Sequence, residues 1–335
     1  MYRDDRRTLL VRRAGYGRRT PSMTNLGPAF VAGIAYVDPG NVATNFTAGS
    51  KFGYLLVWVV VVANAIAVLV QYLSAKLGIA TGRTLPQLCR DVFPRRVSWG
   101  LWLQAEAVAL ATDLAEVLGG AIALNLLFGV PLLAGGVITG AVSFLVLSLQ
   151  TPETQRRFER AIVYFLGMIV FGFVWAAVAA QPSASGAIGG LTPRFDGSES
   201  VLLAAGILGA TVMPHAVYLH SALVRDRFGS RLGDPARRRD LLRATRTDVL
   251  LAMAVAGAVN LAMVLAGAAA LQGLGLDSLH AVYGALGGIL GPSTAVLFAV
   301  ALLASGFASS SVGTYAGSII LEAFSAAIWR CQFGG

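Results

Sequence analysis

Long apolar stretches separated by short polar connections make up most of the chain after residue 24. Two examples are Tyr54–Leu73 and Val249–Leu271. Each is close to the roughly 20 residues with which an α-helix crosses the hydrocarbon core of a bilayer. We therefore predict eight membrane-spanning helices, at residues 25–49, 54–75, 98–118, 131–150, 161–180, 200–224, 248–271 and 293–322.

Composition agrees with a protein embedded in lipid. Hydrophobic residues make up 56% of the chain and charged residues 13%, about half the charged share of an ordinary soluble domain. The net charge of +9 is unevenly placed: if the eight helices alternate in direction, 24 of the 26 Lys and Arg lie on one side. The positive-inside rule then predicts a multi-pass plasma-membrane protein with both termini in the cytoplasm. Topology accounts for the basic excess, so no nucleic-acid partner is expected.

The first predicted helix is interrupted by the sequence Asp38-Pro39-Gly40-Asn41. Proline removes a backbone donor and leaves the carbonyl of the residue four positions earlier, Ala35, without its helical partner. Gly40 allows the chain to turn without steric strain. Irregular backbone at membrane depth is tolerated where it is buried or lines a cavity. This break therefore places a carboxylate, an amide and a carbonyl at one point in the membrane.

A second break interrupts the sixth predicted helix at Met213-Pro214-His215. Pro214 leaves the carbonyl of Ala210 without its helical partner. Two breaks five helices apart are typical of inverted repeats whose discontinuous helices meet at the bilayer midplane. The alternative is that each proline only kinks its helix. The pattern predicts a basic cytoplasmic tail at 1–24, a five-helix repeat at 25–180, an extracellular loop at 181–199 and an incomplete three-helix repeat at 200–335.

The side chains at the two breaks are those of a cation site. The Asp38 carboxylate, the Asn41 amide oxygen and the carbonyls of Ala35 and Ala210 would suit a hard cation. The thioether of Met213 is a soft ligand, which favours transition metals such as Mn²⁺, Fe²⁺, Co²⁺ or Cd²⁺ over Ca²⁺ and Mg²⁺. Met213 could instead fill space in the protein core.

Three acidic residues, Glu106, Asp113 and Glu116, lie on one face of the third predicted helix. Three carboxylates side by side in a medium of low dielectric constant cannot all be ionised, and groups that share protons in this way suit a proton relay. Pairing with basic residues of another helix is the alternative, but no Lys or Arg lies within a predicted span. His215, within the second break, is a further candidate proton acceptor.

Taken together, these motifs resemble the Nramp family of proton-coupled divalent metal transporters. The likeness extends from about Leu26 to Phe324 and includes Asp38-Pro-Gly-Asn, Leu73-Ser-Ala-Lys-Leu-Gly, Ala111-Thr-Asp-Leu-Ala-Glu, Gly190-Leu-Thr-Pro-Arg-Phe, Met213-Pro-His, Tyr218-Leu-His-Ser and Gly313-Thr-Tyr-Ala-Gly. The resemblance implies an all-α, LeuT-like inverted-repeat fold. It also implies that metal is held by Asp38, Asn41, Met213 and the carbonyls of Ala35 and Ala210. Asp113, Glu116 and His215 are implied to move protons.

The resemblance predicts a secondary transporter that imports Mn²⁺ or Fe²⁺ together with protons, with no resident cofactor and no obligate protein partner. With eight predicted spans, the ninth and tenth helices of the family core are expected to be missing, and Phe307 and Ser318 stand where family members often have Gln. The alternatives are a non-transporting remnant and a sodium-coupled small-solute carrier. No HExxH zinc motif occurs, so we predict no enzyme.

Overall fold

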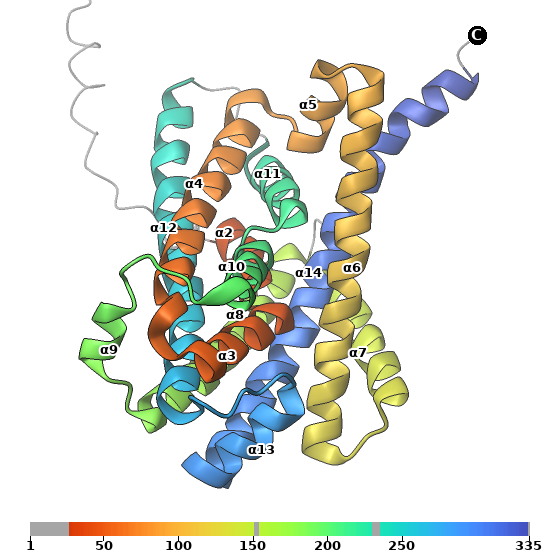
Figure 1. The fold of residues 1–335 in the computed structure, drawn as a ribbon. Coiled ribbons are helices and arrows are strands. Elements are labelled where there is room, and N and C mark those ends of the chain that lie inside the picture. Colours follow the sequence, from red (N-terminus) through yellow and green to blue (C-terminus); the bar gives the residue numbers. More distant parts are fainter. Residues whose placement is uncertain (1–26, 151–153, 230–234, 334–335) are drawn as a thin grey trace, which may run out of the picture.

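The computed structural model describes residues 27–150, 154–229 and 235–333, and every regular element in that part of the chain is helical (Figure 1). The predicted tail at 1–24 lies outside the described residues. Within them, six helical stretches are long and apolar enough to cross a membrane, judged by length and composition. Three shorter apolar helices accompany them, at Pro28–Val37, Leu132–Leu147 and Leu279–Leu290.

The first predicted span is three consecutive pieces: α2 (Pro28–Gly33), the 3₁₀ segment η2 (Ile34–Val37) and α3 (Pro39–Phe52). Pro28 and Pro39 each occupy the first turn of their helix, where proline costs no helical hydrogen bond. A second 3₁₀ segment, η3 (Gly53–Leu56), leads into α4 (Val57–Thr81). The interruption predicted at residues 38–41 is confined to Asp38, because the following residues already belong to α3.

The next helices are α5 (Leu85–Val92), α6 (Arg95–Phe128), α7 (Leu132–Leu147) and α8 (Gln155–Ala180). The helix predicted at 98–118 continues for another ten residues in α6. It ends where Gly129 adopts a left-handed conformation, with φ 68°, which glycine reaches without steric cost. The short helix α5 was not predicted.

The remaining helices are α9 (Ala184–Gly189), α10 (Gly197–Thr211), α11 (Pro214–Phe228), α12 (Pro235–Ala270), α13 (Leu279–Leu290) and α14 (Pro292–Phe333). All eight predicted spans coincide with helices. The basic residues between 225 and 246 that the structure describes belong mainly to α11 and α12. Charged residues extend these helices because their long side chains are good helix formers outside the bilayer.

The helices pack around α12 and α14. The helix α14 lies against α6 and α8, and α12 lies against α3, α4 and α8. Small residues permit these close approaches. At Gly49 on α3, a Cβ atom would lie 2.6 Å from the carbonyl oxygen of Val264 on α12, so a larger residue would push the two helices apart. Most of the large buried side chains form one continuous cluster.

Candidate functional site

Asp38 forms the first helix break. Its backbone is extended, with φ −74° and ψ 169°, between η2 and α3. The carboxylate Oδ1 accepts a hydrogen bond of 2.8 Å from the backbone N–H of Asn41. Asp38 is therefore the N-cap of α3, and its negative charge lies at the positive end of that helix dipole. Only 2% of the residue is exposed, so this carboxylate is held in a fixed position inside the bundle.

Buried amides hold the segment before this break. The Nδ2 group of Asn41 donates to the carbonyl of Tyr36, and that of Asn260 on α12 donates to the same carbonyl at 2.7 Å. Asn45 in turn donates to Oδ1 of Asn260 at 2.6 Å. The Oδ1 atom of Asn41 accepts no hydrogen bond from the described residues. The network thus fixes the Asn41 side chain by its nitrogen and leaves its oxygen available to a cation.

The second break lies between α10 and α11. Val212 and Met213 leave helical geometry, with ψ angles of 76° and 122°, and Pro214 begins α11. Met213 is 3% exposed. His215 in the first turn is buried, and neither of its ring nitrogens makes a hydrogen bond with a described residue. The second break therefore places a thioether and an imidazole at the start of α11. In the same way, the first break places the Asp38 carboxylate at the start of α3.

The two breaks lie in the same part of the bundle. The helix α2 packs against α11, while η2 and α3 pack against α10, between the long helices α12 and α14 (Figure 1). Ala35 and Met213 belong to the same buried cluster, and Ala210 is half-buried near the end of α10. Within the described residues, no three His, Cys, Asp or Glu side chains form a metal-binding group. A cation here would therefore depend on one carboxylate and neutral donors.

The structure brings two of the three α6 acids together. A Cβ atom added to Gly313 on α14 would collide with the Asp113 carboxylate and lie 2.8 Å from Oε2 of Glu116. Glu116 is fully buried, with Ser309 and Asp113 beside it. Neither carboxylate oxygen of Glu116 accepts a hydrogen bond of ordinary geometry from the described residues. Asp113 and Glu116 thus form a pair at the α6–α14 contact.

Glu106 lies apart from this pair. It accepts a hydrogen bond of 3.1 Å from the indole N–H of Trp102 on the same helix. Ten residues separate it from Glu116, which is about 15 Å along a helix axis. Among the described residues, no Lys or Arg forms an ion pair with any of the three acids. The alternative of helix-to-helix ion pairing therefore finds no support in this part of the chain.

A chain of buried hydrogen bonds joins the two broken helices. Gln71 on α4 donates to the Tyr36 hydroxyl at 2.7 Å, and its Oε1 lies 2.7 Å from Nδ1 of His220 on α11. Sequence reasoning missed Tyr36, Asn45 and Asn260. The amides could have been found as polar residues within apolar stretches, the criterion that identified the acids. The partner of Tyr36 could not, because it lies on another helix.

An all-helical bundle with two discontinuous helices at its centre has the architecture of the inverted-repeat transporter fold. The transporter Mhp1, described as a nucleobase-cation-symport-1 family protein, shares this fold with a TM-score of 0.62 at 20% sequence identity, over 92% of this chain and 73% of Mhp1. The manganese transporter of Eremococcus coleocola matches with a TM-score of 0.79 at 33% identity, over 89% of this chain and 65% of that protein.

The family model described as natural resistance-associated macrophage protein-like, Nramp, matches residues 29–332. The chain belongs to the Nramp family. It is 57% identical over 298 residues to a divalent metal cation transporter, MntH, of Mycobacterium tuberculosis (strain ATCC 25618 / H37Rv), covering 89% of this chain and 69% of the relative. It is 48% identical over 302 residues to MntH of Bacillus subtilis (strain 168), and this match covers 89% of this chain and 70% of that relative. The chain thus spans about two thirds of the length of these relatives.

Proposed function

We propose that this integral membrane protein moves divalent transition-metal ions, Mn²⁺ and Fe²⁺, into the cell. The observation that carries the proposal is that two buried residues stand where a helix begins at a break. The Asp38 carboxylate caps α3, and Met213 occupies the N-cap position of α11 without a capping hydrogen bond. A carboxylate and a thioether in one ligand set suit a borderline-soft divalent cation. Relatives that carry the name divalent metal cation transporter support the same substrate class.

The proposed ligands are the Asp38 carboxylate, the Asn41 Oδ1 atom, the Met213 sulfur and the carbonyls of Ala35 and Ala210. Asp38 supplies the charge, and its hydrogen bond from the Asn41 backbone orients it. Asn41 is anchored through Nδ2 to Tyr36, so its oxygen needs little reorganisation to bind. The two carbonyls belong to residues four positions before Pro39 and Pro214, where helical hydrogen bonding is interrupted.

We further propose that metal entry is coupled to proton entry. Glu116 and His215 are buried and Asp113 is half-buried, and all three groups can exchange protons. The helix α6 also meets the first break one turn beyond Glu116, where Gly119 lies against Pro39, the residue after Asp38. Metal at Asp38 would therefore alter proton affinity at Glu116, which is the minimum requirement for coupling. Glu106 lies nearer the N-terminal end of α6 and would extend this pathway toward the cytoplasm.

The remaining features of the proposal concern setting and partners. The protein lies in the plasma membrane with its termini in the cytoplasm, as the distribution of Lys and Arg predicts. Its partners are the transported ion, protons and lipid, and it needs no resident cofactor and performs no enzymatic reaction. A sodium-coupled solute carrier of the same fold would instead use helix N-termini to bind a substrate carboxylate, and Asp38 would repel such a substrate.

The test is Mn²⁺ uptake into proteoliposomes containing the full chain. We expect uptake that rises when the external solution is acidified, does not require Na⁺, and is lost in Asp38→Ala. Asp240→Ala, which removes an exposed carboxylate from α12, is the matched control and should retain uptake. Uptake that survives Asp38→Ala, or that requires Na⁺ and not protons, would contradict the proposal.

A further inference from the structure

One end of the bundle carries an exposed surface that combines basic and bulky apolar side chains. It lies where α5 is followed by α6, at the end where α4 and α11 finish and α12 begins (Figure 1). We name it the 92–99 surface. Its exposed members are Val92, Phe93, Arg95, Arg96, Val97 and Trp99.

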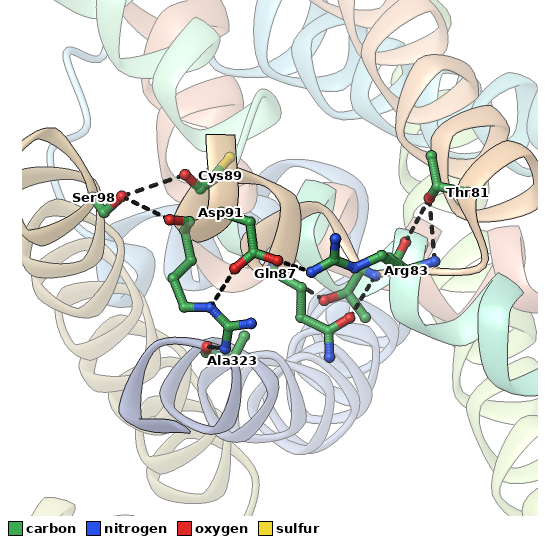
Figure 2. A network of polar contacts seen from close by, with 9 residues as sticks. Thr81, Arg83, Gln87, Cys89, Asp91, Ser98 and Ala323 are labelled. Carbon is green, nitrogen blue, oxygen red and sulfur yellow. Dashed lines mark hydrogen bonds and ion pairs between the residues drawn. The ribbon is translucent and has the colours of Figure 1, made fainter. Parts of the chain in front are cut away.

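The helix that precedes this surface is held firmly to its neighbours (Figure 2). The N-terminus of α5 has a capping box formed by Thr84 and Gln87, and the backbone N–H of Leu85 donates to the Ser221 hydroxyl of α11 at 2.8 Å. At its other end, Arg90 donates to the carbonyl of Ala323 on α14 at 2.6 Å. The surface is therefore preorganised, so a ligand would lose little free energy in ordering it.

Charge on this surface is not balanced by ion pairs with the residues that the structure describes. Arg83 and Arg90 both pair with Asp91, so their charge is partly neutralised. Arg95 and Arg96 are exposed, and neither forms an ion pair with a described residue. They occupy the first turn of α6, where the positive end of the helix dipole adds to their potential. An anion is the complementary ligand.

The side chains that follow these arginines along α6 change from charged to aromatic to aliphatic, as the layers of a bilayer change from headgroup to interface to hydrocarbon. Arg96, Trp99 and Leu103 lie three and four residues apart, on one face of α6. Trp99 lies about 4.5 Å and Leu103 about 10 Å further along the helix than Arg96. They are 42% and 66% exposed. Arginine, tryptophan and leucine in this order match headgroup, interface and hydrocarbon.

We propose that the 92–99 surface binds anionic phospholipid. The guanidinium groups of Arg95 and Arg96 bind the headgroup phosphate, because the planar donors of Arg match phosphate oxygens in pairs. Trp99 enters the boundary between headgroups and acyl chains. A soluble acidic partner would match the charge but not the depth-ordered apolar residues along α6, so the order of side chains favours lipid.

The experiment is native mass spectrometry of the delipidated full chain, titrated with phosphatidylglycerol or with phosphatidylcholine of the same acyl chains. We expect preferential binding of phosphatidylglycerol. The double substitution Arg95→Gln with Arg96→Gln should weaken it roughly 10- to 30-fold, from about a fivefold contribution for each basic residue near an anionic surface. Phosphatidylcholine binding should not change.

The matched control is Arg239→Gln with Arg246→Gln, which removes the same charge from exposed positions of α12, where no aromatic side chain accompanies the arginines. It should keep the preference for phosphatidylglycerol. Circular dichroism and Mn²⁺ binding check that both double variants are folded. Equal binding of the two lipids, an equal loss in the control, or displacement of phosphatidylglycerol by inorganic phosphate would overturn the proposal.

Discussion

The hydroxyl of Ser305 on α14 donates a hydrogen bond of 2.7 Å to the carbonyl of Val37, the residue before Asp38. Both residues are fully buried. The carbonyl belongs to the 3₁₀ segment that ends at the first break, where regular helical partners are missing. The long helix α14 thus supplies a side chain that satisfies the interrupted backbone and fixes the position of Asp38.

Replacement of Ser305 by Ala should destabilise the protein and weaken metal binding. The Val37 carbonyl would be left buried without a donor, which costs about 1–3 kcal/mol. Thermal unfolding in detergent and Mn²⁺ titration measure the two effects. Ser318→Ala is the control, because this exposed hydroxyl donates to the carbonyl of Tyr315 on its own helix, and it should change neither quantity.

Gly119→Ala should disturb the first break through α6, whereas Ser305 acts on it through α14. A Cβ atom at Gly119 on α6 would collide with the ring of Pro39, and relief of such overpacking typically costs about 1–3 kcal/mol. On the same helix, Gly100 has open space where a Cβ would lie. Gly100→Ala should therefore be neutral or stabilise by up to about 1 kcal/mol. Equal stability of the two variants would show that α6 does not contact the break as described.

Met213→Ala should change which cations bind. If the Met213 sulfur is a ligand, its removal weakens Cd²⁺ and Mn²⁺ binding and leaves Ca²⁺ binding unchanged, because Ca²⁺ gains little from a thioether. Met253→Ala is the matched control, since Met253 is also fully buried. Both substitutions create a cavity that costs about 2–5 kcal/mol. Competition titrations should show altered preference in Met213→Ala alone.

Asp113→Asn should separate metal movement from proton movement. The substitution keeps the shape of the side chain but removes a group that can bind and release a proton. In the unsubstituted protein, uptake should increase as external pH falls, because the inward proton gradient increases. In Asp113→Asn, Mn²⁺ binding should persist while this dependence flattens. An unchanged pH profile would remove Asp113 from the proton pathway.

Local sequence features predicted much of this protein. Apolar stretches of bilayer length located a helix at each of the eight predicted positions, because a helix satisfies its own backbone and needs no distant partner in lipid. Asp38-Pro39 and Met213-Pro214 located the breaks, because proline disrupts helical hydrogen bonding whatever surrounds it. Helical spacing placed Asp113 and Glu116 on one face. The length of α12 was underestimated because its polar N-terminal end lacks the apolar pattern of a span, whereas α6 continues beyond its predicted end through the apolar residues 119–128.

Only the tertiary structure decided which side chains meet. Val37 and Ser305 are 268 residues apart, and Asn45 and Asn260 are 215 apart. No local pattern encodes such pairs, since they depend on how whole helices pack. The sequence by itself determined where the helices run and where they break, because those outcomes depend on neighbours along the chain. Packing determined the partners of the buried polar groups, because in a bundle those partners come from other helices.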